Sequence, residues 1–358
     1  MYFFYAYAKL YDMDIELNER SRIPDMLKIA GMAIAVIILL LLLVRCFFRL
    51  PVRDYYKSSR KVFEIPDIGN GYIAQGISYD DSSDMFFLTG YMKDSSASPI
   101  YIVSREDGAL KKSLHLNDSA GNPLVIHAGG LTAHGDYIYV AGNLGDNLYV
   151  FDKNEALNAE DGAGINCLGT YNVRLSDNDY VEIAFTTVCD GKLYIGEFFR
   201  QENYPTPLSH HITTPGGDEN TALMVGIPFS TDEGSLFGLS DKPAEAYSIP
   251  SLAQGACFKD NKIYLSTSYA LAFSNVYVYN DMKKTGSTIN VLDTEVPLYF
   301  LDSSTLFKTL KLPPMSEEIE IVGDEMFTQC ESASDKYIFG KITGGKYIYA
   351  TRITTEDQ

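Results

Sequence analysis

Five stretches of the chain repeat one arrangement of apolar and polar residues. Each has a short apolar strand, a tight polar turn, and a second strand in which aromatic or aliphatic residues alternate with polar ones. The stretches are QGISYDDSSDMFFLTGY from Gln75, GGLTAHGDYIYVAGN from Gly129, VEIAFTTVCDGKLYIGEF from Val181, QGACFKDNKIYLSTSY from Gln254 and EEIEIVGDEMFTQCES from Glu317. The pattern predicts one β-hairpin, repeated five times.

Two further strands accompany each hairpin. The third strands are SPIYIVSRE, NLYVFDK, TALMVGIPF, NVYVYND and, last, KYIFGKI or KYIYATR. Fourth strands ALKKSLHL, LGTYNVRL, EAYSIP and LFKTLKLP each precede a later hairpin, whereas RKVFEIP from Arg60 precedes the first. The hairpins begin about 52 to 73 residues apart, an interval that brackets the period of four-stranded propeller blades.

The order of these strands predicts how the two ends of the repeat region meet. A fourth-type strand begins the region and third-type strands end it, so both ends contribute to one blade, and a closed ring leaves few sheet edges exposed. We therefore predict an all-β fold, a five-bladed β-propeller, over residues 60–355. A six-bladed ring is the alternative, because VPLYFLDS from Val296 is a surplus strand and one interval is long.

A continuous apolar run precedes the repeats. IAGMAIAVIILLLLLV, from Ile29 to Val44, contains no charge and is followed by Arg45 and Arg49, whose side chains can reach the interface of a bilayer that about 20 apolar residues span. We predict an N-terminal tail over 1–27, a transmembrane signal anchor over 28–50 and a linker over 51–59. No small-residue cleavage site follows the run, as a removed signal peptide would require.

Basic residues flank the apolar run on both sides, and their excess downstream would keep the large domain in the cytoplasm by the positive-inside rule. An N-terminal membrane segment before one β-rich domain is, however, the usual layout of an exported protein. We therefore expect a single-pass protein of the cell membrane with the propeller outside the cytoplasm.

Composition and charge limit the classes of molecule that the protein can bind. With 358 residues, 46% hydrophobic and 21% charged, the chain can bury a large core. The net charge is −18, and residues 1–61 hold ten basic and six acidic residues, so the remainder carries −22. Nucleic acid is excluded as a partner because phosphate binding needs a basic face. The cysteines lack metal-ligand spacing; we expect buried free thiols, with a Cys167–Cys189 disulfide as the alternative.

A propeller would bring several polar residues of the repeats to one opening on its axis. The first strands begin at Gln75, His127 with Gly129, Glu182, Gln254, and Glu317 with Glu318, and the second strands end at Tyr91, Asn143, Glu197, Tyr269 and Glu331. The predicted ligand-binding residues are Gln75, His127, Glu182, Glu197, Gln254, Tyr269, Glu318 and Glu331.

The chemistry of this opening permits three interpretations. Carboxylate and amide oxygens suit Ca²⁺, with Glu182, Glu317 and Glu318 as candidate ligands, whereas ordered water in the channel is the alternative. Glu182 or Glu318 with His127 could act in acid–base catalysis. No G-x-S-x-G, Walker, H-E-x-x-H or paired C-x-x-C motif occurs, so the usual nucleophile, phosphate and zinc signatures are missing.

An insertion follows the second strand of the third repeat. RQENYPTPLSHHITTPGGDEN, Arg200 to Asn220, should lie over the opening, as a lid or specificity loop would. It contains His210 and His211, and because adjacent side chains rarely point the same way, we expect them to be polar surface residues rather than metal ligands.

Together QGIS, HAGGLTA, GEF, PPMSEEI and ESASDKY resemble an uncharacterised group of bacterial exported or membrane-anchored β-propellers. This resemblance implies the broad class of strictosidine-synthase-like and gluconolactonase-like propellers, which often hold a cation on the axis. The chain departs from the group's pattern with Ala74 in place of proline and Glu318 in place of glycine.

The sequence favours one function and leaves two alternatives. The favoured function is a membrane-anchored recognition module that binds a small ligand, glycan, cell-surface protein or cation through its axial face. The alternatives are a Ca²⁺-dependent hydrolase of phosphate esters, lactones or glycans, and a protein-interaction scaffold.

Overall fold

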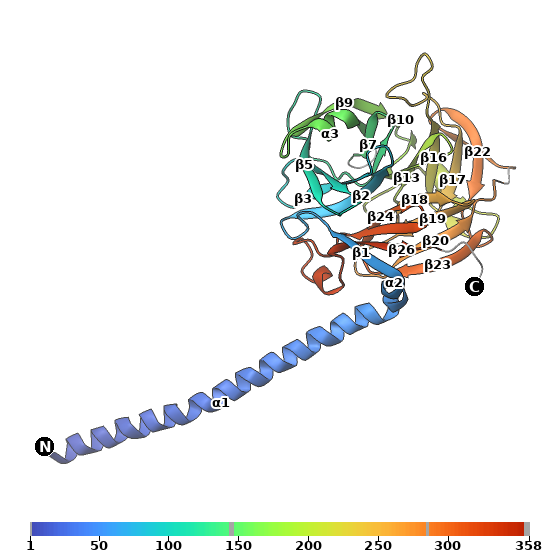
Figure 1. Ribbon diagram of the computed structural model, residues 1–358. Helices are drawn as coiled ribbons and strands as arrows, with labels where there is room; N and C mark the ends of the chain where they lie inside the picture. Colours follow the sequence, from blue (N-terminus) through green and yellow to red (C-terminus); the bar gives the residue numbers. More distant parts are fainter. Residues whose placement is uncertain (1, 143–146, 284–285, 354–358) are drawn as a thin grey trace. The chain divides into compact units, whose positions relative to one another are not determined.

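The computed structural model describes residues 2–142, 147–283 and 286–353, with side chains from residue 26 onward. The chain divides into two compact units, residues 1–50 and 51–358. The first unit consists of helix α1 (Tyr2–Arg49), and the second is built mainly of β-strands (Figure 1). The short helices are η1 (Leu50–Val52), α2 (Arg53–Ser58), α3 (Lys153–Asn158), η2 (Leu208–His210) and η3 (Gly340–Ile342).

Helix α1 carries the apolar run. The large apolar side chains from Ile29 to Val44 are exposed, and among the residues with described side chains one helical stretch, within Met26–Ser58, is long and apolar enough to cross a membrane. Exposed apolar surface of this extent is unfavourable in water. The helix is therefore suited to a membrane anchor or a signal sequence.

The second unit contains five modules of four strands each within its described residues. The inner strands are β2 (Tyr72–Asp80), β6 (Leu131–His134), β12 (Ile183–Cys189), β18 (Ala253–Lys259) and β24 (Ser316–Val322). Their hairpin partners are β3 (Met85–Met92), β7 (Tyr137–Ala141), β13 (Lys192–Glu197), β19 (Lys262–Thr267) and β25 (Glu325–Cys330). Each predicted hairpin is therefore present, and its turn carries Gly, Asn or Asp residues with positive φ, such as Asp190 and Gly191.

The third and fourth strands of the modules also follow the predicted order. The third strands are β4 (Pro99–Ser104), β8 (Asn147–Asp152), β16 (Ala222–Pro228), β20 (Ser274–Asn280) and β26 (Tyr347–Arg352). The fourth strands are β5 (Leu110–Asn117), β9 (Gly164–Asn172), β17 (Glu245–Ile249), β23 (Leu306–Leu312) and β1 (Ser59–Glu64). Of the two candidates for the last third strand, KYIYATR forms β26, whereas KYIFGKI contains η3.

The modules form a ring. Strand β2 packs against β6 and β24, β12 against β6 and β18, and β18 against β24, so the inner strands contact one another in a closed cycle. The fifth module combines both ends of the domain, because β1 pairs antiparallel with β26, with Arg60 opposite Ala350. This is the arrangement of a β-propeller, and the predicted pairing of the first and last strands is confirmed.

Additional strands extend two parts of the ring. Fourth strands β5 and β9 pair in parallel, which joins the first two modules into a nearly closed, barrel-like eight-stranded sheet. The surplus strand predicted at Val296 is β22 (Thr294–Phe300), which pairs in parallel with β17 and antiparallel with β21 (Thr288–Val291). It thus lengthens the sheet of the third module. Strands β10 (Arg174–Ser176) and β11 (Asp179–Tyr180) form a separate small hairpin.

The core is divided among the seams between successive modules. Five clusters of buried apolar side chains each join two neighbouring modules, and the cluster between the fourth and fifth modules also buries Val52 and Tyr55 from the linker. The ring is therefore held together by side-to-side burial of apolar area. Cys167, Cys257 and Cys330 are buried free thiols, and Cys189 is free as well, so the predicted alternative of a Cys167–Cys189 disulfide is wrong.

Candidate functional site

A break in strand pairing recurs near the start of the inner strands. The register shifts between Ala74 and Gly76, between Ile183 and Phe185, between Ala253 and Gly255, and between Ser316 and Ile319. Each shift inserts one extra residue, and such a β-bulge re-aims the side chain that it carries. The extra residues are Gln75, Ala184, Gln254 and Glu317, and all four line one cavity.

This axial cavity has a volume of about 710 Å³. Of the predicted site residues, Gln75, His127, Glu182, Gln254, Tyr269 and Glu331 line it, and so does Glu317, which was predicted as a metal ligand. The structure therefore brings together residues that are up to 256 positions apart in the chain. Glu197 and Glu318 do not line the cavity, and the predicted residue Asn143 lies outside the described residues.

A chain of polar contacts runs along one wall of the cavity. His127 Nε2 lies 2.8 Å from Gln75 Oε1, and Gln75 Nε2 donates to Glu331 Oε2 at 3.0 Å. Because the amide oxygen of Gln75 can only accept, His127 carries its proton on Nε2. Burial lowers the pKa of His127 to about 4, so the imidazole is neutral at pH 7, and its ring stacks on Tyr91 with centroids 4.6 Å apart.

Two carboxyl groups of the cavity are held in an environment that disfavours their ionised form. Burial, reinforced by the charges of Glu331 and Glu318, raises the pKa of Glu317 well above its usual range. Burial also raises the pKa of Glu331 to about 7, although Tyr337 donates a hydrogen bond to it at 2.9 Å. Only 3% of Glu317 is exposed. Among the described residues, its carboxyl group has no hydrogen-bond partner.

Glu318 has a different role from the one predicted for it. Its Oε2 accepts from the backbone N–H groups of Ile77 and Leu131, at 2.8 and 3.1 Å, and its Oε1 accepts from that of Thr186 at 3.0 Å. These amides occupy equivalent positions in β2, β6 and β12. The carboxyl group of Glu318 therefore ties three inner strands to β24 across the axis, and it has no contact with the cavity.

Glycines at equivalent positions make room for this side chain. In the paired register, Gly76 of β2 and Gly255 of β18 are equivalent to Glu318 of β24. A glycine was expected at the position of Glu318, and these two strands have one. A Cβ atom on Gly255 would lie 2.8 Å from Cα of Glu318, and one on Gly130 would lie 2.9 Å from its Oε1. The axis can therefore accommodate one long side chain, and Glu318 supplies it.

Glu197 is also placed differently from the prediction. In the paired register, Glu197 is opposite Ile183, whereas Gly90 and Cys330 hold this position in β3 and β25. Glu197 is therefore equivalent to the residue before Tyr91 and the residue before Glu331. Because side chains alternate between the two faces of a strand, a difference of one residue turns the Glu197 side chain to the opposite face. Phe198 holds the predicted position and lines the cavity.

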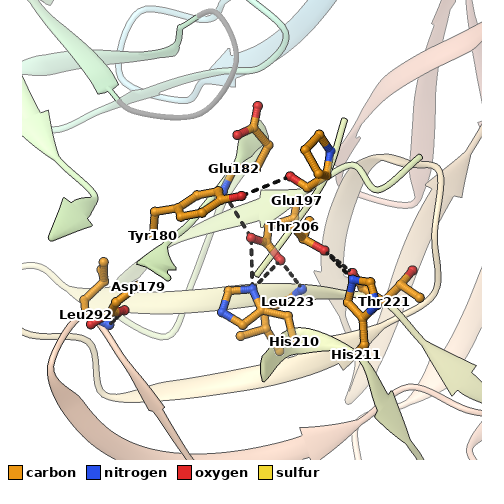
Figure 2. A network of polar contacts seen from close by, with 11 residues as sticks. Asp179, Tyr180, Glu182, Glu197, Thr206, His210, His211, Thr221, Leu223 and Leu292 are labelled. Carbon is orange, nitrogen blue, oxygen red and sulfur yellow. Dashed lines mark hydrogen bonds and ion pairs between the residues drawn. The ribbon is translucent and has the colours of Figure 1, made fainter. Parts of the chain in front are cut away.

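The Glu197 carboxylate is fully buried behind the cavity wall. Figure 2 shows it between His210 and the backbone of Leu223, with Glu182 extending away from His210. His210 Nδ1 lies 3.1 and 2.9 Å from its two oxygens, the N–H of Leu223 donates at 2.7 Å, and that of Glu182 donates at 3.1 Å. The expectation that His210 is a polar surface residue is therefore wrong. His211 faces Thr206 Oγ1 at 3.0 Å (Figure 2).

We call residues 200–220 the lid. It contains the predicted insertion, with the small hairpin of β14 (Ile212–Thr213) and β15 (Glu219–Asn220). Asn203 and Tyr204 line the cavity, and the Arg200 guanidinium lies 4.5 Å from the ring centroid of Tyr269 in the fourth module. The lid is thus held over the cavity by a cation–π contact at one end and by His210 near its middle.

Replacing His210 with alanine should loosen the lid. Glu197 keeps its two amide donors but loses its side-chain partner, so we expect the free energy of unfolding to fall by about 1 to 2 kcal/mol. Hydrogen–deuterium exchange of residues 200–220 should become roughly tenfold faster. The matched control is His211→Ala, which should change the exchange little. Equal exchange in both variants would contradict this role of His210.

The structure places part of the predicted catalytic and metal-binding sets in the cavity. Among the described residues, no group of three or more His, Cys, Asp or Glu side chains could hold a metal ion. Glu182 and His127 line the cavity, but Glu318 is engaged by three backbone amides. Of the two predicted acid–base pairs, Glu182 with His127 therefore lies in the cavity, whereas Glu318 with His127 does not come together there.

Comparison with known proteins adds general likeness of fold. No family model matches the sequence, and no curated protein sequence is significantly similar to it. Similar solved structures include a luciferin-regenerating enzyme (11% identity, 82% of this chain and 95% of that chain covered, TM-score 0.42). A second is a glutaminyl cyclase from Myxococcus xanthus (13% identity, 83% of this chain and 95% of that chain covered, TM-score 0.41). A third is the PQQ-bound aldose sugar dehydrogenase from Streptomyces coelicolor (12% identity, 82% of this chain and 96% of that chain covered, TM-score 0.43).

Proposed function

We propose that this protein is a membrane-anchored recognition module whose propeller, outside the cytoplasm, binds a small ligand in the axial cavity. Each module is one blade, so the propeller has five blades. The closed cycle of inner strands supports this count, as does the pairing of the surplus strand β22 with the third module. The exposed apolar side chains of α1 support the anchor.

The observation that carries the ligand-binding role is the state of Glu317. Its carboxyl group is buried in the wall of a cavity and has no hydrogen-bond partner within the described part of the chain. Burying a polar group without a partner destabilises a folded protein by about 1 to 3 kcal/mol, so the group is expected to gain its partner from a bound molecule. The volume of about 710 Å³ is typical of small-molecule sites.

A thermal-shift panel tests this function. The full-length protein in mild detergent would be heated with amines, sugars, carboxylic acids and CaCl₂. We expect at least one class to raise the melting temperature by about 2 °C or more at millimolar concentration. The rise should disappear in Ala184→Phe, because Ala184 lines the cavity and the larger side chain occupies it.

Two results would contradict ligand binding in the cavity. One is that no compound stabilises the protein. The other is that the stabilising compounds act equally on Ala184→Phe, which would place their binding elsewhere on the molecule.

A further inference from the structure

The axial cavity has more acidic than basic groups in its wall. Glu182, Glu317 and Glu331 line it, and Lys336 is the one basic side chain among its described lining residues other than the neutral His127. Lys336 donates to the hydroxyl group of Tyr91 and lies 4.7 Å from the centroid of that ring. It forms no ion pair with a described carboxylate. Acidic side chains therefore outnumber basic ones in the cavity wall, although the positive charge of Lys336 acts on Glu331 and lowers its pKa.

Glu317 and Glu331 both line this cavity and lie close enough for their charges to interact. They directly follow Ser316 and Cys330, which are paired across β24 and β25. Glu331 Oε2 accepts from Gln75 and Tyr337, whereas the Glu317 carboxyl group has no hydrogen-bond partner among the residues that the structure describes. A group that donates hydrogen bonds and carries positive charge would complete this pair, because it removes the repulsion that arises between two neighbouring buried carboxylates when both are ionised.

We propose that the ligand is an organic cation, a protonated primary amine whose ammonium group is bound between the carboxyl groups of Glu317 and Glu331. This inference rests on the proposed function. An ammonium group has three N–H donors, which match the two carboxyl groups and the side-chain oxygen of Gln254. Gln254 lines the cavity, and its side chain has no hydrogen-bond partner among the described residues.

The aromatic wall suits the same class of ligand. Phe198, Tyr204, Tyr269 and Tyr337 line the cavity, and the faces of two of them already contact protein cations, Arg200 at Tyr269 and Lys336 at Tyr337. Aromatic faces attract cations and also contact the hydrocarbon part of an amine. A Ca²⁺ ion fits less well, because it needs six to eight oxygen ligands, and among the described residues no group of three or more His, Cys, Asp or Glu side chains could hold a metal ion.

Binding of an amine should release protons from the cavity. Burial keeps the carboxyl groups of Glu317 and Glu331 protonated at pH values where free glutamate is ionised, and an ammonium group favours their ionised form. The amine itself stays protonated below about pH 9, so its affinity should rise from pH 6 to pH 8. The other titratable groups that face the cavity are Glu182, His127, Tyr91, Tyr204, Tyr269, Lys336 and Tyr337.

Isothermal titration calorimetry of the full-length protein in detergent tests the inference. The probes are benzylamine, tyramine and cadaverine, each paired with its neutral hydroxyl analogue: benzyl alcohol, tyrosol and pentane-1,5-diol. We expect at least one amine to bind at least tenfold more tightly than its analogue, with an affinity that increases from pH 6 to pH 8. Glu317→Gln should weaken that binding at least tenfold.

Glu320→Gln is the matched control. Glu320 is on the same strand, and burial raises its pKa to about 7, but it does not line the cavity. The variant should bind the amine like the parent protein. Equal loss in both variants, equal affinity for amine and alcohol, or no binding of any of the three amines would overturn the inference.

The same experiments separate this inference from the proposed function. If a sugar, an acid or CaCl₂ stabilises the protein, and Ala184→Phe abolishes the effect while the amines fail, the cavity is a ligand site but not for an organic cation. If no compound of any class acts through the cavity, both proposals fail.

Discussion

Replacing Glu318 with alanine is expected to lower the free energy of unfolding of the propeller by about 3 to 6 kcal/mol. Three backbone N–H groups, in Ile77, Leu131 and Thr186, lose their acceptor, and each buried donor without a partner costs about 1 to 3 kcal/mol. Water entering the vacated space would offset part of this loss. The expected change is a large fraction of the total stability of a typical domain.

Urea unfolding of the full-length protein in detergent measures the effect, followed by tyrosine fluorescence because the chain has 26 Tyr and no Trp. Glu318→Gln keeps one carbonyl oxygen for two of the three amides but directs an NH₂ group at the third, so it should lose less than Glu318→Ala. It also provides a measurement if the alanine variant does not fold.

Glu317→Gln is the matched control, one residue away on the same strand. The Glu317 carboxyl group has no described hydrogen-bond partner, so its replacement by a neutral amide should leave stability unchanged or raise it. Equal destabilisation by Glu317→Gln and Glu318→Gln would show that burial of an acid, rather than the contact with three strands, determines the effect.

The difference between these neighbouring acids marks the limit of what the sequence could predict. The repeated hairpins were predicted because apolar alternation and turn residues are local signals, and the pairing of β1 with β26 followed from strand order. The sequence placed Glu317 and Glu318 together at the opening. In the structure Glu317 lines the cavity, whereas Glu318 binds the backbone of three other strands. This difference depends on a β-bulge, which interrupts the two-residue alternation of side chains along the strand.

The same reason explains the error at Glu197. Aligning the hairpins by residue type matched Glu197 with Glu331, but the paired register matches Glu331 with Phe198. One further signal was present in the sequence: Gln75–Gly76 and Gln254–Gly255 repeat a polar residue before a glycine, and these pairs mark the bulge in β2 and β18. The partner of Glu197, His210, comes from an insertion without a repeat pattern, and only tertiary structure brings the two together.

The stability of the propeller should decrease as the pH rises from about 5 to 8. Burial raises the pKa values of Glu317, Glu318, Glu320 and Glu331, the last two to about 7. Between the unfolded pKa, near 4.3, and these higher values, the folded protein binds more protons than the unfolded chain. Stability is therefore greatest below the unfolded pKa and is lost as the pH rises through the folded values.

The magnitude follows from Glu331. A rise from its ordinary value of 4.5 to about 7 corresponds to roughly 3 kcal/mol of stability lost across this interval. Carboxyl groups with lowered pKa, such as Asp80 beside Lys153, act in the opposite direction, but they act below their unfolded pKa. The two effects therefore occupy different ranges of pH.

Urea unfolding at pH 5.5 and pH 8.0 measures the decrease, and a double variant, Glu317→Gln/Glu331→Gln, assigns it. The variant should reduce the difference between the two pH values by about 2 to 3 kcal/mol, whereas the remaining slope reports Glu318 and Glu320. Glu106→Gln, at an exposed position, should leave the difference unchanged.

If the double variant keeps the full pH dependence of the parent protein, the two cavity carboxyl groups are already ionised at neutral pH. A bound ammonium group would then displace no protons from them, so the same result would also remove the expected rise in amine affinity between pH 6 and pH 8.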